Sequence, residues 1–285
     1  MPKIIQWLRA MIREARLYRK LLQRGSHAMG MRSYFQALHY LAIHYESRTL
    51  RYTRPFFRFI HQCAARSENG LVLYRCRINN TPMVLMLRRE NQGDYRVAGE
   101  LTDGIYTAPK SAPSHIYDCG ANIGTFTLFA ACKFPGAKLV CYEPDPDNLT
   151  LLKENLRRNN IKADIRSCGV WSQDGKLYYH PDNSITGRVD ETVSAYPIPV
   201  EALRIRAEKT WVKLDIEGAE YQVIPALMDQ PHLPFYLSIE VHFYNVKGQP
   251  LIQLLKDRGY TLHGYLNPAN ECVVFDAMLN PADGE

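Results

Sequence analysis

The chain has 285 residues, of which 46% are hydrophobic and 22% charged, a composition typical of a folded globular protein. No apolar run reaches the ~18–20 residues that a membrane-spanning helix needs. Charged residues interrupt the apolar ones from Arg9 onward, which is not typical of a secretory signal. Seven scattered cysteines without a C-x-x-C pair disfavour a zinc site and fit a reducing compartment. We therefore expect a cytoplasmic protein.

The net charge of +6 comes from the N-terminal part of the chain. Residues 1–70 hold 13 Lys and Arg against three acidic residues, so the remainder carries a charge of −4. Apolar residues at three- and four-residue spacing between residues 3 and 24 predict an amphipathic helix with a basic face. Two interpretations stay open. The helix packs on the protein core or a partner subunit, or it makes peripheral contact with the inner membrane surface.

Residues 71–113 are predicted to form a small β-hairpin and a linker, after a basic helical extension at 1–70. Two apolar runs, 71–78 and 83–87, are separated by the turn-forming residues 79–82, which is typical of an antiparallel hairpin. The residues that follow are loop-like, with one short helix.

From residue 114 the pattern changes, and residues 114–285 are predicted to form the main domain. Short apolar runs alternate with helical stretches, which favours βαβ units and an α/β fold with a doubly wound, mainly parallel sheet. Seven strands are expected, at 115–118, 138–142, 163–167, 210–215, 235–242, 260–264 and 271–276. Four helices are expected, at 123–132, 146–159, 218–229 and 248–258.

The strongest motif is the glycine-containing run at residues 118–124, between an apolar strand and an apolar helix. Gly120 permits a tight turn from strand to helix, and Gly124 permits close approach of that helix. Ligands of such sheets bind at the carboxyl ends of the strands. The run lacks the third glycine of a dinucleotide loop, and the leading Asp118 suits a ligand with a cationic aminoacyl end.

An acidic residue also ends the next predicted strand. Glu143, followed by Pro144, lies 25 residues after Asp118. A carboxylate at this place can accept hydrogen bonds from both hydroxyls of an adenosine ribose. Asp145 and Asp147 are expected to cap the following helix.

Further polar residues end two later strands. Asp215 is expected at the carboxyl edge of the sheet beside the glycine loop, where it can hold an aminoacyl group or orient a second substrate. Glu217 is interpreted either as a site residue or as a first-turn acid favoured by the helix dipole, and the same alternatives hold for Glu220. Glu240 and His242 are two residues apart in a predicted strand, so both are expected to point to one face.

Three motifs in this order, at residues 118–124, 142–148 and 213–220, resemble the FkbM family of S-adenosylmethionine (SAM)-dependent methyltransferases. The resemblance covers roughly residues 94–276. It implies a class I methyltransferase fold with a seven-stranded, Rossmann-like sheet, and SAM as the cofactor. Many relatives methylate hydroxyls of sugars, glycolipids or other natural products. The cofactor-binding residues expected from the motifs and the resemblance are Asp118, Gly120, Ala121, Asn122, Gly124, Glu143, Pro144, Asp215 and Glu217.

An alcohol is a poor nucleophile, so methyl transfer to it needs a base. We predict His242 as this base, with Glu240 and Asp215 as further catalytic residues. No metal is assigned, but one alternative stays open, in which Asp215, Glu217, Glu240 and His242 converge on one divalent ion. Arg188 is interpreted either as a contact for an anionic acceptor or as a solvated loop charge.

The expected partner is a small-molecule or glycan acceptor. A second hypothesis is a nucleic-acid methyltransferase that uses residues 1–70 as a basic arm. The net acidic main domain and the lack of an Asn-Pro-Pro-Tyr-type loop disfavour it. A third hypothesis is a non-catalytic SAM-binding protein. The sequence leaves the oligomeric state open.

Overall fold

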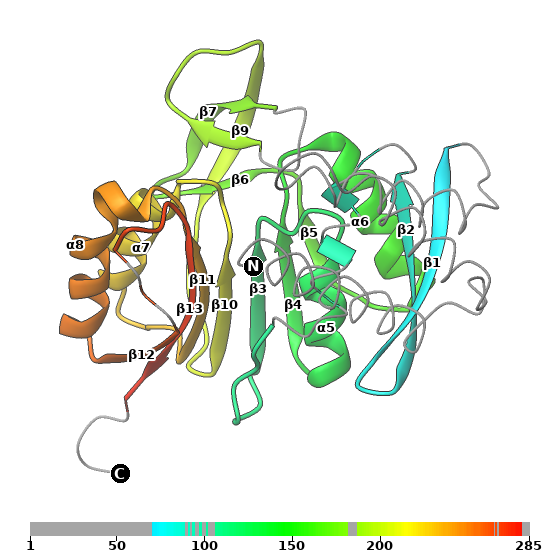
Figure 1. The fold of residues 1–285 in the computed structure, drawn as a ribbon, viewed down its shortest axis with the longest axis horizontal. Coiled ribbons are helices and arrows are strands. Elements are labelled where there is room, and N and C mark those ends of the chain that lie inside the picture. The colour runs from blue at the N-terminus through cyan, green and yellow to red at the C-terminus, as the bar shows by residue number, and fades with distance from the viewer. Residues whose placement is uncertain are drawn as a thin grey trace, which may run out of the picture. The chain divides into compact units, whose positions relative to one another are not determined.

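A computed structural model describes most of the chain beyond residue 69 (Figure 1). The described residues are 70–88, 91, 93–94, 97–98, 101, 106–181, 187–264, 266 and 268–280. The chain divides into two compact units, Met1–Tyr106 and Thr107–Glu285. The predicted basic helix at 3–24 lies outside the described residues, so the extension and its membrane contact stay predictions. Within the described part of the chain, no helix has the length and apolar character needed to cross a membrane.

The predicted antiparallel hairpin is present in the first unit, as β1 (Leu71–Ile78) and β2 (Thr81–Arg88). Asn79 and Asn80 connect the strands, both with positive φ, 47° and 67°. Such a two-residue turn matches the twist of the paired strands. β2 therefore begins at Thr81 and not at the predicted residue 83, because the turn needs only the two asparagines.

The second unit is built on a seven-stranded sheet of order β12-β13-β11-β10-β3-β4-β5. Its strands are β3 (His115–Cys119), β4 (Lys138–Tyr142), β5 (Asp164–Arg166), β10 (Thr210–Leu214), β11 (Tyr236–Val241), β12 (Tyr260–Gly264) and β13 (Val273–Leu279). All pairings are parallel except those of β13, which is antiparallel to both its neighbours. The predicted doubly wound sheet with seven strands is confirmed. Its order reverses between β3 and β10, the kind of switch point at which such sheets bind ligands.

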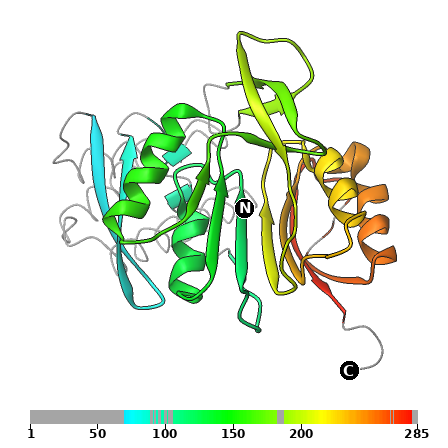
Figure 2. The same ribbon diagram turned by 180° about the vertical axis from the view of Figure 1, so that it is seen from behind.

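Helices cover both faces of this sheet: α5 (Thr125–Lys133), α6 (Pro146–Arg158), α7 (Glu220–Met228) and α8 (Tyr244–Asp257). Figures 1 and 2 show α5 and α6 on one side of the sheet and α7 and α8 on the other. α8 begins at Tyr244, earlier than the predicted residue 248. Gly248 is part of this helix. The Tyr244 ring packs where a Cβ of residue 248 would lie, so this position requires glycine.

A second sheet, which the sequence did not predict, lies between β5 and β10 in the chain. Its four strands, in the order β6-β9-β7-β8, are β6 (Gly169–Trp171), β7 (Gly175–His180), β8 (Arg188–Asp190) and β9 (Tyr196–Ala202). Pro197 and Pro199 argue against a strand at β9, since proline cannot donate to a sheet ladder. β6 pairs only with Val200–Ala202 of β9, so no β6 partner is lost at the two prolines. Figures 1 and 2 show this sheet at the carboxyl end of the parallel strands.

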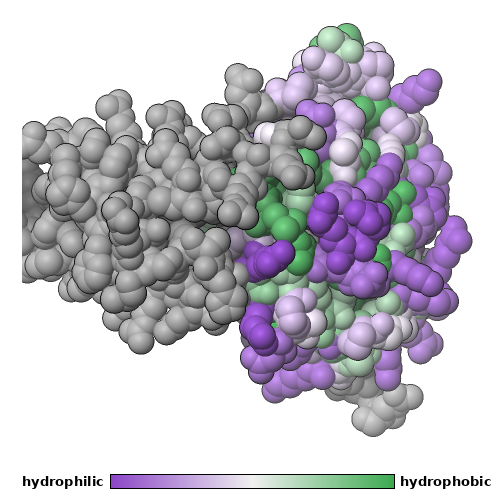
Figure 3. Space-filling model, turned by 90° about the vertical axis from the view of Figure 1, so that its right-hand side faces the viewer, coloured by the Kyte–Doolittle hydropathy of each residue, from purple (hydrophilic) through white to green (hydrophobic). Residues whose placement is uncertain are grey.

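The centre of the seven-stranded sheet is well packed. All five residues of β10 are buried. The ring of Trp211 packs edge-on against Phe126 of α5, with 4.9 Å between ring centroids, and its Nε1 donates to Ser238 Oγ of β11 at 3.1 Å. On the face drawn in Figure 3, hydrophilic residues alternate with hydrophobic ones, as on the surface of most globular proteins. The rigid sheet thus holds its carboxyl edge in a defined position.

Candidate functional site

Main-chain hydrogen bonds join the carboxyl ends of β3, β4 and β10. The amides of Gly120 and Ala121 donate to the carbonyl of Tyr142 at 3.0 and 2.9 Å. The amide of Asp215 donates to the carbonyl of Cys119 at 3.2 Å. The three sequence motifs, which are far apart in the chain, therefore meet at one edge of the sheet.

The loop after β3 needs its glycines for steric reasons. Gly120 has a φ of 77°, and a Cβ there would lie 1.9 Å from the carbonyl oxygen of Asp215. Gly124 has a φ of 92°, and its Cβ would lie 2.8 Å from a methyl group of Leu152 in α6. The first glycine lets the loop approach β10, and the second lets α5 pack against α6. Asn122, with a φ of 49°, takes a left-handed conformation that asparagine tolerates better than most residues.

Glu143 follows β4 directly and is only 5% exposed. Its Oε2 accepts a hydrogen bond from the Asn122 amide at 2.7 Å, and its Oε1 accepts one from the Asp145 amide at 3.0 Å. Burial raises the pKa of Glu143 to about 7, although these amides favour the charged form. The carboxylate thus holds the glycine loop and the start of α6 together.

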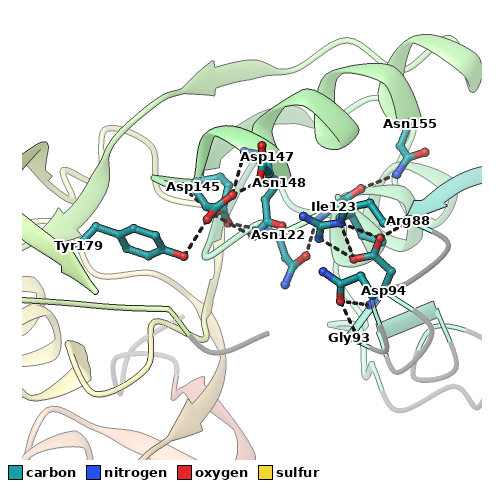
Figure 4. A network of polar contacts seen from close by, with 12 residues as sticks. Arg88, Gly93, Asp94, Asn122, Ile123, Asp145, Asp147, Asn148, Asn155 and Tyr179 are labelled. Carbon is teal, nitrogen blue, oxygen red and sulfur yellow. Dashed lines mark hydrogen bonds and ion pairs between the residues drawn. The ribbon is translucent and has the colours of Figure 1, made fainter. Parts of the chain in front are cut away.

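Asp145 is the N-cap of α6, as predicted, and accepts from the amides of Asp147 and Asn148 at 2.8 and 2.9 Å (Figure 4). Its second oxygen accepts from the hydroxyl of Tyr179 in β7 at 3.0 Å (Figure 4). This bond ties the four-stranded sheet to the loop beside Glu143. Tyr179 was missed because its strand has no clear periodic signal.

Lys213 lies inside β10 with its side chain almost fully buried, and the sequence analysis gave it no role. Its Nζ donates to the Gly120 carbonyl at 2.7 Å and lies 3.5 Å from Asp118 Oδ1 and 3.4 Å from Asp215 Oδ2. Asp118 is 2% exposed and accepts from the Thr127 hydroxyl at 2.5 Å. Burial raises the pKa of Asp118, and the Lys213 ammonium opposes this shift. A charged residue in an otherwise apolar strand was the signal that could have identified it.

His242 lies at the centre of a cluster of carboxylates. Its Nε2 is 3.1 Å from Glu217 Oε2 and 3.8 Å from Glu240 Oε1, and its Nδ1 is 3.3 Å from Glu220 Oε1. The structure therefore brings Glu240 and His242 together, as predicted. β11 ends at Val241, so His242 belongs to the turn before α8 and not to the strand.

Glu220 contacts both His242 and the turn that carries Glu217. It is completely buried, and its two oxygens accept from the amides of Ile216 and Gly218 at 3.1 and 2.9 Å. These bonds hold the turn in which Glu217 has a φ of 55°. Glu220 is thus both the first-turn acid of α7 and a direct neighbour of His242, so the two interpretations of this residue are compatible.

The charges of the cluster influence one another. Burial lowers the pKa of His242, but the hydrogen bond to Glu220 and the charges of Glu220 and Glu217 outweigh it and raise the pKa to about 9. Burial raises the pKa of Glu217 to about 7, with contributions from Asp215 and Glu240, although His242 opposes the shift. A protonated imidazole at neutral pH is therefore shared among several carboxylates.

Two groups of side chains within the described residues bring potential metal ligands within 4.8 Å of one another. One consists of Asp215, Glu217 and His242, and the other of Glu240, His242 and Cys272. Arg188 takes no part in them: it is an exposed residue whose Nε donates to Asp190 at 2.8 Å. This pairing agrees with the interpretation of Arg188 as a solvated charge.

The strand order, the antiparallel β13 and a ligand-binding edge at the switch point together define the class I methyltransferase fold. Residues 118–262 match the family model of the methyltransferase FkbM domain, and the chain belongs to this family. The expected cofactor, SAM, is confirmed by this membership.

Individual relatives are distant. Methyltransferase sdnD of Sordaria araneosa is 27% identical over 191 residues, which are 52% of this chain and 73% of the relative. The 31-O-demethyl-FK506 methyltransferase FkbM of Streptomyces tacrolimicus is 32% identical over 72 residues, 25% of this chain and 28% of the relative. The crystal structure of methyltransferase FkbM from Methylobacillus flagellatus KT matches with a TM-score of 0.42 and 18% identity, covering 95% of this chain and 60% of that one.

Proposed function

We propose that the protein transfers the methyl group of SAM to a hydroxyl of a sugar, glycolipid or other natural product. The observation that carries this proposal is that Asp215 takes part in both halves of the site. Its main chain is bonded to the end of β3 beside the glycine loop, and its side chain belongs to the group formed with Glu217 and His242. One residue thus connects the expected cofactor side to the expected acceptor side.

The residues on the cofactor side fit an adenosyl sulfonium ligand. Glu143 supplies a buried carboxylate at the strand end where a ribose is expected. Asp118 Oδ1 is buried beside the glycine loop, 3.5 Å from the Lys213 ammonium. The loop residues Ala121 and Asn122 follow Asp118 in the sequence, and the Asn122 amide donates to Glu143.

When bound, SAM supplies a methyl group on a sulfonium sulfur. The protein has to hold the acceptor hydroxyl in line with the methyl carbon, about 3 Å away, and to exclude water. As the carbon–oxygen bond forms, the carbon–sulfur bond breaks with its electron pair going to sulfur, and the hydroxyl proton leaves to a base. We assign the proton to a carboxylate beside His242, either Glu217 at 3.1 Å or Glu240 at 3.8 Å, because the pKa of about 9 keeps the imidazole itself protonated at neutral pH.

The choice of an oxygen acceptor is supported by the name of one relative. The FkbM protein of Streptomyces tacrolimicus is named a 31-O-demethyl-FK506 methyltransferase, a name that places the methyl group on an oxygen. A carboxylate–imidazole cluster is also the kind of group that alcohol methylation needs, since an alcohol has to lose a proton.

The test is to incubate the purified chain with methyl-labelled SAM and with separate extracts of glycans, lipids and RNA. Label in a glycan or lipid product that survives mild base, as an ether does, supports the proposal. Label in RNA would replace it with the nucleic-acid hypothesis, and SAM binding without any transfer would favour a non-catalytic protein. The predicted membrane contact of residues 3–24 is tested separately by partition onto anionic liposomes.

A further inference from the structure

Asp215, Glu217 and His242 present three potential ligand atoms within 4.8 Å of one another. His242 Nε2 and Glu217 Oε2 lie 3.1 Å apart. A divalent ion with ligands at about 2.0–2.2 Å places neighbouring ligand atoms about 3 Å apart. The group therefore needs only small side-chain adjustments to surround one ion.

The backbone fixes these side chains at the edge of the sheet. Asp215 is anchored by its amide, which donates to Cys119 at 3.2 Å. Glu217 lies in a turn that buried Glu220 holds through the amides of Ile216 and Gly218. Hence the backbone that carries the Asp215 and Glu217 side chains is held in place by hydrogen bonds.

Glu220 also orients the imidazole. Its Oε1 lies 3.3 Å from His242 Nδ1, and it is completely buried. Nε2 lies 3.1 Å from Glu217, so a cation that replaces the Nε2 proton would lie on the Glu217 side, while Nδ1–H stays directed at Glu220. A metal-binding histidine commonly donates its other ring N–H to a carboxylate in this way.

The local charge also favours a cation. Three carboxylates lie within 3.8 Å of the ring nitrogens of His242, namely those of Glu217, Glu220 and Glu240. Asp215 is a fourth carboxylate in the same group of potential ligands. Lys213 lies 3.4 Å from Asp215. Since an imidazole that binds a metal ion is neutral, the carboxylates outnumber the positive groups, and a divalent cation would offset most of the excess negative charge.

We propose that Asp215, Glu217 and His242 bind one hard divalent cation, such as Mg²⁺ or Mn²⁺. Two carboxylates and one imidazole suit such ions. The Cys272 thiol is engaged as a donor to Glu240 at 3.0 Å, so a soft thiolate site is disfavoured.

Three protein ligands leave coordination positions for water and for an acceptor oxygen. This role in methyl transfer rests on the proposed function, whereas binding of the cation itself does not. With the cation in place, Glu240 is the carboxylate that remains to take the hydroxyl proton.

The test measures binding of Mn²⁺ alone to the full, chelator-treated chain. Calorimetry gives the affinity, and the loss of the electron paramagnetic resonance signal of free Mn²⁺ gives the amount bound. We expect one ion per chain. Glu217→Gln and Asp215→Asn should each weaken binding at least about tenfold. Glu191→Gln, which changes an exposed acidic residue outside the cluster, should leave binding unchanged. Circular dichroism checks that each variant is folded.

Lack of stoichiometric Mn²⁺ binding would overturn the proposal, and so would equal affinity in the wild type and both cluster variants. Calorimetry with SAM on the same samples separates the two proposals. Mn²⁺ binding without SAM binding would leave the cation site intact and remove the proposed function. SAM binding and methyl transfer without Mn²⁺ binding would do the reverse.

Discussion

The Asn122 amide donates a 2.7 Å hydrogen bond to Oε2 of Glu143, so the acid at the end of β4 holds the glycine loop that follows β3. Replacing it with glutamine removes the charge but keeps the shape. We expect Glu143→Gln to weaken SAM binding by about 1–3 kcal/mol, the scale of hydrogen bonds to charged groups. Calorimetry measures this, with Asp147→Asn in the exposed first turn of α6 as the control. Unchanged affinity in Glu143→Gln would remove Glu143 from the cofactor site.

The same carboxyl predicts opposite pH dependences for stability and binding. Burial raises the pKa of Glu143 from 4.5 to about 7, so the folded chain binds more protons than the unfolded chain between these values. The contribution of Glu143 to the free energy of unfolding without ligand therefore falls as pH rises through this interval. SAM affinity should rise instead, because the ionised carboxylate accepts the ribose hydrogen bonds. Urea unfolding and calorimetry across this interval check both signs, and Glu143→Gln should remove both dependences.

Gly120→Ala is expected to abolish SAM binding and to destabilise the fold. The added Cβ would lie 1.9 Å from the Asp215 carbonyl oxygen, and the φ of 77° disfavours any side chain. Gly136→Ala is the matched control, because nothing lies within 4 Å of a Cβ at that position. Differential scanning fluorimetry with and without SAM compares the two variants. A Gly120→Ala protein with normal ligand-induced stabilisation would contradict the proposed loop geometry.

His242→Ala should reduce turnover by about 10²–10⁴ while SAM affinity stays similar. The imidazole contacts Glu217 and Glu220, on the side of the edge that we assign to the acceptor. His232→Ala, at an exposed position, controls for the loss of a histidine. Single-turnover rates with labelled SAM give the chemical step. Turnover that survives in His242→Ala would make this residue structural.

Replacement of Glu220 by alanine is predicted to lower the free energy of unfolding. Glu220→Ala leaves the amides of Ile216 and Gly218 without their present acceptor in a half-buried turn. An unsatisfied buried donor costs about 1–3 kcal/mol, so the midpoint of urea unfolding should fall clearly. Glu220→Gln keeps one acceptor oxygen and should recover part of the loss. If Glu220→Ala and Glu220→Gln were both as stable as the wild type, the turn would not depend on this carboxylate.

The main sheet could be predicted from sequence because most of its strands are short, largely apolar runs, although β5 has only one apolar residue, Ile165. The four-stranded sheet could not, since β6 and β8 have three residues each and β9 carries two prolines. The acid-ended strands were recognised because parallel strands bring their carboxyl ends to one edge. Lys213 and Tyr179 were missed because their roles depend on contacts with Gly120 and Asp145, which are distant in sequence.

The four-stranded sheet leaves the main sheet after β5 and returns to it at β10, so its strands form one continuous insertion. The Tyr179 hydroxyl is a side-chain link from this insertion to Asp145, next to the residue that we assign to the ribose. Val170 of β6 also belongs to the main hydrophobic core, and Trp171 and Tyr179 pack in one cluster with Ala219. Replacement of this segment would therefore disturb the packing of the main sheet as well as the Asp145 cap.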